Sequence, residues 1–238
     1  MKINIAHLYP DLLNLYGDRG NIATLKYRLE KRGIEANVTE YGIDDKIDFA
    51  KTDIIYIGGG SEKEQKLVCQ ELLPVKDSLK EFAENGGSIL AVCSGYEILG
   101  KYYETESEKI PCLEILDIYT KYIGQRLIGN IIIDSELINS TIVGFENHAG
   151  RVFAGNHTPL GTVRSGYGGN GEDKKEGVVY KNVIATHMHG PLLPKNPMLA
   201  DHIIKNALKK KYNEDIELCT LDDTLENQSH TYCIENFS

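Results

Sequence analysis

The chain of 238 residues has no tryptophan and only five cysteines, and these absences exclude several classes of protein. The cysteines lie at wide, irregular spacings without a C-x-x-C pair, which argues against a zinc ribbon and against a dense disulfide framework. No apolar stretch approaches the length of a membrane span, and the N-terminal segment lacks the hydrophobic region of a signal peptide. We therefore expect a cytoplasmic protein in a reducing compartment, without a membrane span.

Basic residues are also too few for a typical nucleic-acid-binding protein, because the net charge is -9. Seven of the acidic residues follow Tyr212, where there is no Lys or Arg, so the rest of the chain is nearly neutral. We expect one domain over residues 1–212 and an acidic C-terminal tail over residues 213–238. The tail could form a strand and a helix, a docking arm or a partly disordered segment, and a solvated end is the simplest interpretation.

Alternating strand-like and helix-like segments fill the first part of the chain. The predicted strands are Lys2 to Tyr9, Ile34 to Tyr41, Asp53 to Ile57 and Ser88 to Val92, and the predicted helices are Asn21 to Lys31 and Glu62 to Asn85. Asn21 is the expected N-cap of the first helix, and Pro74 is expected to interrupt the second. This alternation favours an α/β fold with right-handed crossovers and a doubly wound parallel sheet.

From Leu113 onward, short β-like segments separated by turns replace this pattern. They are Leu113 to Tyr119, Arg126 to Asp134, Thr141 to Phe145, Gly161 to Val163, Gly177 to Tyr180 and Val183 to Thr186. Short segments of this kind predict an antiparallel β extension. Asn196 and Pro197 then begin a final helix, which we expect to run to Lys211.

Cys93 stands where an apolar strand-like run meets the expected start of a helix, beginning Ser94-Gly95. Such a junction is typical of a nucleophile elbow, here with Cys in place of Ser. Unpaired N–H groups at a helix N-terminus lower the pKa of a cysteine thiol and can receive an oxyanion. A buried packing residue is the competing interpretation and, for an isolated Cys, the more common one. Cys93 is therefore a candidate nucleophile for acyl transfer.

His189 follows another apolar run and is the candidate base for Cys93. If the preceding strand continues, His187 and His189 share one face, because side chains alternate along a strand. An H-x-H pair could also bind a metal, with His148, His157 or Asp18 as speculative further ligands, although a histidine at a strand end is usually structural.

Three consecutive glycines, Gly58 to Gly60, end a predicted central strand. They are not followed by the residues of a P-loop or of a dinucleotide fingerprint, so a nucleotide site is not supported. Their backbone N–H groups could instead form part of an oxyanion hole facing Cys93, or simply allow a tight turn. Because ligands bind beyond the carboxyl ends of parallel strands, we expect residues 9–21, 58–61 and 93–95 to converge.

Six segments of the chain carry, in order, a resemblance to a known family. They are Tyr9 to Asn21 (YPDLLNLYGDRGN), Ile57 to Gln65 (IGGGSEKEQ), Cys93 to Tyr96 (CSGY), Gly144 to His148 (GFENH), Lys174 to Gly177 (KKEG) and His189 to Pro197 (HGPLLPKNP). These segments resemble the GatD glutaminase subunits, in the cobyric-acid-synthase-like branch of class I glutamine amidotransferases. The resemblance runs from about Ile3 to Lys211 and implies a flavodoxin-like doubly wound, mostly parallel sheet with an antiparallel β extension.

This resemblance implies an activity and a partner. Cys93 would attack the side-chain amide of L-glutamine, His189 would shuttle protons, and ammonia would pass to a Mur-ligase-like subunit, MurT, in a heterodimer. That partner would use ATP and Mg²⁺ to amidate the α-carboxyl of D-glutamate in the lipid II stem peptide to D-isoglutamine. No cofactor or metal is expected in this subunit.

Further site residues follow from the same resemblance. Arg126 would hold the α-carboxylate of glutamine, and Asp18 would orient the histidine or the substrate. The backbone of Ser94, with Gly59 and Gly60, would serve the developing oxyanion. One departure concerns the position two residues after the histidine, where most class I amidotransferases have Glu and this chain has Pro191. The pair then acts as a dyad, or an acid from elsewhere such as Asp18 completes it.

Two other interpretations stay open at this level. A glutaminase for cobyrinate amidation normally comes fused to a nucleotide-binding synthetase domain, for which 238 residues leave no room. A catalytically inactive amidotransferase-like scaffold is the third possibility, and the presence of both Cys93 and His189 counts against it.

Overall fold

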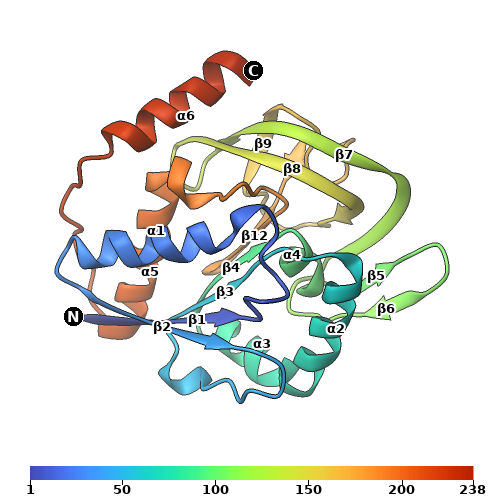
Figure 1. Cartoon of the computed structure of the whole chain (residues 1–238), viewed down its shortest axis with the longest axis horizontal. Coiled ribbons are helices and arrows are strands. Elements are labelled where there is room, and N and C mark those ends of the chain that lie inside the picture. Colours follow the sequence, from blue (N-terminus) through green and yellow to red (C-terminus); the bar gives the residue numbers. More distant parts are fainter. Residues whose placement is uncertain (238) are drawn as a thin grey trace.

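A computed structural model of the protein describes residues 1–237, which form two β-sheets flanked by helices (Figure 1). The first sheet has six strands in the order β11-β12-β4-β3-β1-β2. These strands are β1 (Lys2–Leu8), β2 (Glu35–Tyr41), β3 (Ile54–Ile57), β4 (Ser88–Val92), β11 (Val178–Tyr180) and β12 (Val183–Thr186). All neighbours in this sheet are parallel except β11, which pairs with β12 in the antiparallel sense.

Helices cover both faces of the first sheet, because alternate residues of its central strands point to opposite sides. Ile54 and Tyr56 belong to the core under α1 (Arg19–Glu30) and α5 (Pro197–Tyr212), whereas Ile55 and Ile57 belong to the other core (Figure 1). That second core includes α2 (Glu62–Leu72), α3 (Lys76–Glu84) and α4 (Ser94–Ile98). The strand order is that of flavodoxin-like folds, and the predicted fold class is confirmed.

Short 3₁₀ turns join several of these elements. They are η1 (Leu15–Gly17), η2 (Phe49–Lys51), η3 (Leu73–Val75) and η4 (Leu193–Lys195). The turn η3 contains Pro74 and separates α2 from α3, as the position of the proline predicts.

Asn21 does not cap α1, contrary to expectation, because the helix already begins at Arg19. Its side chain is buried in the first turn, where Nδ2 donates to the Tyr56 hydroxyl at 2.9 Å and Oδ1 accepts from the Leu193 N–H at 2.8 Å. Asn21 therefore joins α1 to β3 and to η4.

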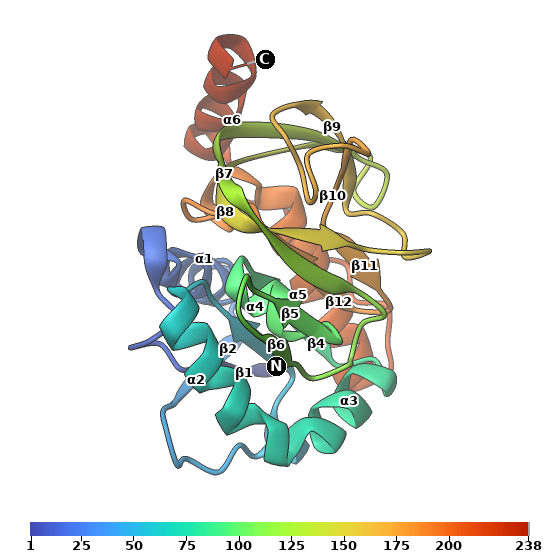
Figure 2. The same cartoon turned by 90° about the vertical axis from the view of Figure 1, so that its right-hand side faces the viewer.

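The second sheet is mainly antiparallel, as predicted for the β extension, and forms a separate layer over the first (Figure 2). Its order is β10-β9-β7-β5-β6, with β8 paired to β7. These strands are β5 (Tyr102–Glu104), β6 (Lys109–Pro111), β7 (Tyr119–Ser135), β8 (Ser140–Phe153), β9 (Gly161–Ser165) and β10 (Lys175–Glu176). The register between β7 and β8 shifts between Tyr122 and Leu127, so Arg126 lies at an irregularity of this long hairpin.

The predicted strand from Leu113 to Tyr119 is wrong. Its N–H groups turn back to the end of α4, with Leu113 donating to the Ile98 carbonyl at 3.0 Å and Ile115 to the Leu99 carbonyl at 3.0 Å. These bonds satisfy carbonyls that a helix end leaves open, and they keep the segment out of the sheet. The β5–β6 hairpin, which sequence periodicity did not predict, precedes this loop.

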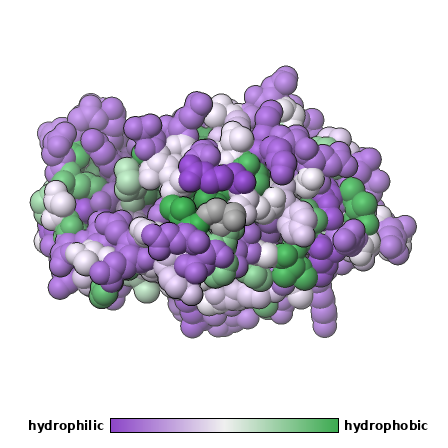
Figure 3. All heavy atoms as spheres, turned by 90° about the horizontal axis from the view of Figure 1, so that it is seen from above, coloured by the Kyte–Doolittle hydropathy of each residue, from purple (hydrophilic) through white to green (hydrophobic). Residues whose placement is uncertain are grey.

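The acidic tail contains a helix, α6 (Thr224–Phe237), with no buried residue. It reaches the body through polar contacts, in which His230 Nδ1 lies 2.7 Å from the Lys195 carbonyl and Nε2 lies 2.7 Å from the Thr141 hydroxyl. Seen from the side of α6, the surface is mostly hydrophilic, with apolar side chains in small separate groups (Figure 3). A helix was one of the expected alternatives for the tail, whereas the domain boundary after residue 212 stays a prediction.

Within residues 1–237, no helix is both long and apolar enough to span a bilayer.

Candidate active site

Cys93 occupies a sharp turn between β4 and α4, with φ 53° and ψ -115°. A residue other than glycine is strained in this region, at a cost of about 1–3 kcal/mol. The turn is held on both sides, because the Cys93 N–H donates to the Thr186 carbonyl at 2.8 Å and the Glu97 N–H donates to the Cys93 carbonyl at 3.2 Å. The strand, turn and helix predicted around the nucleophile are therefore present.

Three loops meet at this turn, as the strand topology predicts. The Leu15 N–H donates to the Gly59 carbonyl at 2.9 Å, and the Gly95 N–H donates to the Gly58 carbonyl at 3.2 Å. Ser94 completes the contact with its hydroxyl, which accepts from the Gly60 N–H at 2.6 Å. These bonds fix the loops after β1, β3 and β4 against one another.

Gly59 lies directly beside the nucleophile. A Cβ atom at this position would stand 3.0 Å from Cys93 Cβ and 3.3 Å from Asp18 Oδ2, so a side chain would push one of these neighbours aside by a few tenths of an ångström. Its N–H donates to Asp18 Oδ2 at 2.9 Å, and the Gly60 N–H donates to Ser94. Each of these glycine N–H groups therefore has an acceptor in this conformation, and their expected part in an oxyanion hole stays a prediction. The Ser94 N–H favours the charged form of the Cys93 sulfur and so acts to lower its pKa.

His189 does not lie on a continuation of the preceding strand, as the alternation of side chains assumed. The strand β12 ends at Thr186, and His189 instead pairs with Phe145 of β8 through two backbone hydrogen bonds of 2.9 and 3.0 Å. Its Nδ1 lies 3.9 Å from Asp18 Oδ2, which is an ion-pair distance and too long for a hydrogen bond. The imidazole is wholly buried, and neither ring nitrogen has a hydrogen-bond partner within residues 1–237.

His187 has different surroundings from His189, because the strand stops before both residues. Its Nε2 lies 3.3 Å from Glu97 Oε1, and its ring stacks on His148 with the centroids 3.7 Å apart. His157 lies apart from these rings and accepts the Asp117 N–H at 2.9 Å. His148 and His187 are thus the considered residues that come together, and residues 1–237 hold no group of three or more His, Cys, Asp or Glu side chains that could bind a metal.

The pKa of Cys93 is raised, not lowered as the elbow predicts. Burial is the main cause, and the negative charges of Glu97 and Asp18 add to it, whereas the Ser94 N–H and the charge of Arg126 act in the opposite direction. The helix that follows Cys93 has only five residues, so its dipole is short and does not offset burial. The side chain of Cys93 is therefore a thiol at rest.

Further acidic groups lie buried behind Cys93, where the two sheets meet. Burial raises the pKa of Glu97 on α4 to about 7 and that of Glu176 on β10 to about 7. Gln65 Nε2 donates to Glu97 at 2.8 Å, and Glu176 accepts the His187 N–H at 2.7 Å. Sequence analysis did not identify this group, although Glu97 stands one helical turn after the nucleophile.

Arg126 extends from β7 and is exposed. Its Nε donates to Asn147 Oδ1 at 2.8 Å, and its Nη2 donates to the Asn147 carbonyl at 3.0 Å. The Asn147 amide in turn donates to the Tyr16 hydroxyl. Neither Asn147 nor Tyr16 was singled out from the sequence, although both fall within segments that carry the family resemblance.

Pro191 fills the position where many class I amidotransferases have an acid. It packs against the first turn of α1, where a Cβ on Gly20 would stand 2.4 Å from Pro191 Cγ. The position two residues after His189 therefore serves packing against α1, and Asp18 is the acidic group that lies within ion-pair distance of the imidazole.

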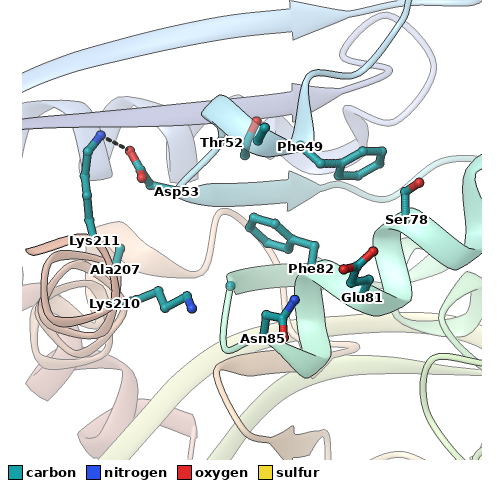
Figure 4. Close-up of a pocket in the computed structure, with 12 residues that line it drawn as sticks. Phe49, Thr52, Asp53, Ser78, Glu81, Phe82, Asn85, Ala207, Lys210 and Lys211 are labelled. Carbon is teal, nitrogen blue, oxygen red and sulfur yellow. Dashed lines mark hydrogen bonds and ion pairs between the residues drawn. The ribbon is translucent and has the colours of Figure 1, made fainter. Parts of the chain in front are cut away.

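A cavity of about 460 Å³ lies at the opposite end of the parallel strands (Figure 4). Its walls include Phe49 and Phe82, together with Lys210 near the end of α5. Asp53 and Gly87 place it before β3 and β4, at their amino ends. Because active sites of open α/β sheets lie beyond the carboxyl ends, we place the functional site at Cys93.

Comparison with known proteins identifies the family to which the chain belongs. Residues 4–197 match the CobB/CobQ-like glutamine amidotransferase domain family. The chain belongs to this family. Its resemblance to the GatD subunits, predicted from the six motif segments, is confirmed. It is thus a glutamine amidotransferase, as predicted.

Two curated relatives cover most of the amidotransferase chain. One is the lipid II isoglutaminyl synthase (glutamine-hydrolyzing) subunit GatD of Staphylococcus aureus, which is 46% identical over 211 residues, 88% of this chain and 86% of that protein. The subunit of the same name from Streptococcus pneumoniae is 42% identical over 230 residues, 95% of this chain and 88% of that protein.

Solved structures support the amidotransferase fold. A glutamine amidotransferase from Thermotoga maritima superposes with a TM-score of 0.55 at 12% identity, covering 97% of this chain and 92% of that one. Another glutamine amidotransferase superposes with a TM-score of 0.55 at 18% identity, covering 85% and 98%. At these identities the likeness concerns the fold alone.

Proposed function

We propose that this chain is the glutaminase subunit of a lipid II isoglutaminyl synthase and supplies ammonia for the amidation of peptidoglycan precursors. The observation that carries the proposal is the 46% and 42% identity, over at least 88% of the chain, to two subunits bearing that name. The geometry supports it, because a cysteine in a strained turn, a buried histidine and a buried carboxylate stand together at one end of the parallel sheet.

The reaction begins with attack of the Cys93 sulfur on the side-chain amide carbon of L-glutamine. Because the resting group is a thiol, its proton passes to His189 as the C–S bond forms. His189 then protonates the amide nitrogen, the C–N bond breaks, and ammonia leaves a thioester on the sulfur. Water hydrolyses this thioester, which releases glutamate and restores the thiol.

Other site residues support these steps. Asp18 lies 3.9 Å from the imidazole and stabilises the imidazolium that forms during the attack. The Ser94 N–H, at the start of α4, is the donor for the developing oxyanion, while Gly59 and Gly60 line the site next to it. Arg126 offers a guanidinium fork that suits the α-carboxylate of glutamine.

The partner is a Mur-ligase-like subunit, MurT, that forms a heterodimer with this chain. It binds ATP and Mg²⁺, activates the α-carboxyl of D-glutamate in the lipid II stem peptide and receives the ammonia. This subunit needs no cofactor of its own, since cysteine chemistry hydrolyses glutamine without one. The five cysteines, all free, agree with a cytoplasmic location.

A glutaminase of cobyrinate amidation is the alternative function. Cobyric acid synthase of Listeria innocua is 28% identical over 168 residues, which make up 66% of this chain and 32% of that protein. Its identity is lower than that of the two GatD subunits, so the lipid II pathway is favoured. A non-catalytic scaffold is disfavoured because Cys93 and His189 lie in one buried site.

Glutamine hydrolysis by the purified chain, with and without the MurT-type partner, tests the proposal. We expect release of ammonia and glutamate, and we expect Cys93→Ala to abolish it. Cys219→Ala is the matched control, because Cys219 is exposed in the tail. Activity retained in Cys93→Ala would contradict the nucleophile. Absence of a complex and of lipid II amidation would favour the cobyrinate or scaffold alternative.

A further inference from the structure

The proposed nucleophile and base are covered in this conformation. His189 is 0% exposed and Cys93 is 8% exposed. A glutamine that is to react with the sulfur and exchange a proton with the imidazole must therefore displace a group that covers them.

Tyr16 is the side chain best placed to move. Its ring packs edge-on against His189 with the centroids 4.6 Å apart, yet Tyr16 is itself 44% exposed, so it separates the imidazole from solvent. Its φ of 56° is unfavourable for a residue with a side chain, and it interrupts η1. A strained, half-exposed residue is released at lower cost than one packed in the core.

Two residues of β8 hold Tyr16 in place. Phe145 approaches the Tyr16 ring at a centroid distance of 6.0 Å, and the Asn147 amide donates to the Tyr16 hydroxyl. They stand two residues apart on one strand and therefore project from the same face. Phe145 also bonds to the backbone of His189, so one short stretch of β8 holds both the base and its cover.

Arg126 holds the side chain of Asn147 in place through hydrogen bonds. It donates to both the side-chain oxygen and the carbonyl of Asn147, at 2.8 and 3.0 Å, which fixes the amide that holds Tyr16. The chain of contacts Arg126, Asn147, Tyr16 and His189 thus joins an exposed cation to a buried imidazole. A carboxylate that takes the guanidinium N–H groups competes with Asn147 for the same donors.

We propose that Tyr16 is a positioning residue that acts as a gate over His189, and that a carboxylate on Arg126 opens the gate through Asn147. The inference rests on the proposed function for the identity of that carboxylate, the α-carboxylate of glutamine. Primary amides that lack an α-carboxylate do not open the gate, so Tyr16 contributes to substrate specificity.

Alkylation of Cys93 by iodoacetamide measures the closed state without any turnover. In a Cys219→Ser/Cys233→Ser background only buried cysteines remain. Tyr16→Phe keeps the ring and removes the hydroxyl, and we expect Cys93 to be alkylated about 2- to 10-fold faster, the effect of one lost hydrogen bond. Asn147→Ala should give the same increase, and the double variant no more than either single variant.

Tyr27→Phe is the control variant. Tyr27 lies on the exposed side of α1, so this substitution should not change the alkylation rate of Cys93.

The steady-state constants KM and kcat provide a second measurement. A Tyr16 that served only the stability of the fold would not change KM in the way expected here. If a substitution increases the fraction of molecules with an open gate, the apparent KM for glutamine falls by the factor by which that fraction rises. We expect Tyr16→Phe to lower the KM for glutamine about 2- to 10-fold with kcat little changed, and to narrow the preference for glutamine over 4-aminobutanamide, which lacks the carboxylate.

The outcomes separate the two proposals. If wild-type protein hydrolyses glutamine but Tyr16→Phe alters neither the alkylation rate nor KM, the gate is wrong and the glutaminase stands. If Tyr16→Phe and Asn147→Ala accelerate alkylation equally while the wild-type complex hydrolyses no glutamine, the gate stands and the proposed function fails.

Discussion

The two sheets contribute to the site in different ways. The first sheet supplies the proposed nucleophile from a buried loop at its carboxyl end, where Cys93 and Gly59 are fixed by hydrogen bonds of the backbone. The second sheet supplies side chains from a long hairpin, where Arg126 is exposed and reaches the site through Asn147. The difference teaches that rigid backbone positions the chemistry, whereas an exposed arm is suited to recognising the substrate.

The largest effect that distinguishes the two sheets is expected when one methyl group is added to a glycine of each. The methyl group should be harmful beside Cys93 and tolerated on β7. Gly59→Ala places a Cβ 3.0 Å from Cys93 Cβ, and displacement of the proposed nucleophile should lower kcat by about one to two orders of magnitude. Gly129→Ala on β7 is the control, since no atom stands within 4 Å of the added group. Near-normal kcat in Gly59→Ala would mean that the first sheet is less rigid than its hydrogen bonds indicate.

A second prediction concerns the junction between the sheets, where Glu97 is buried. Its pKa is raised from 4.5 to about 7 in the folded protein, so its contribution to stability is fully present below pH 4.5 and is lost as the pH rises through 7. Glu97→Gln removes this titration. Relative to wild type, the variant should gain about 2.5 kcal/mol in unfolding free energy between pH 5 and pH 8.

Urea unfolding of both proteins at both pH values measures this difference in free energy. Glu176 titrates in the wild type and in the variant alike, so its contribution cancels when the two proteins are compared. Glu106→Gln, on an exposed turn, is the control and should follow the wild-type profile. A variant that tracks wild type at both pH values would show that Glu97 is hydrated in solution.

A smaller effect is expected for Arg126, which lies on the second sheet and is proposed to recognise the substrate. Arg126→Lys keeps the charge but loses the planar fork that can bind a carboxylate through two parallel hydrogen bonds. We expect the KM for glutamine to rise about tenfold while kcat changes much less, because the residue acts in binding. A fall in kcat at constant KM would instead place Arg126 among the groups that act on the reacting atoms.

The tail lies outside both sheets and should matter least. Arg28, whose side chain is 2% exposed, donates to Asp201 and to Asp223 at the start of the tail. Asp223→Asn should lower the unfolding free energy by about 1 kcal/mol, because Arg28 keeps Asp201 as a partner. Glutaminase activity should not change, and Glu217→Gln in the exposed part of the tail should affect neither quantity.

Local patterns in the sequence predicted the backbone arrangement around Cys93. The turn at Cys93, the three converging loops and the doubly wound sheet all follow from short strand, glycine and helix signals. Such signals act over neighbouring residues, so they can be recognised without knowing how distant segments pack.

Interactions between distant segments could not be predicted in this way. The pairing of His189 with Phe145, and the contact of Asn147 with Tyr16, join residues far apart in the chain. Asn21 was expected as a cap because of its type, yet Tyr56 and Leu193 use its amide as a buried link. The direction of the Cys93 pKa shift was wrong for a related reason, since burial is a property of the whole fold.

The backbone bridge between His189 and Phe145 has a consequence for the distance between the proposed nucleophile and the proposed base. Cys93 belongs to the first sheet, whereas His189 is hydrogen-bonded to the second, so each sheet holds one member of the pair. Sliding one layer over the other by about 1 Å would alter this separation and slow the reaction about a hundredfold. The packing between the two layers is therefore itself a determinant of turnover, even at positions that contact neither residue.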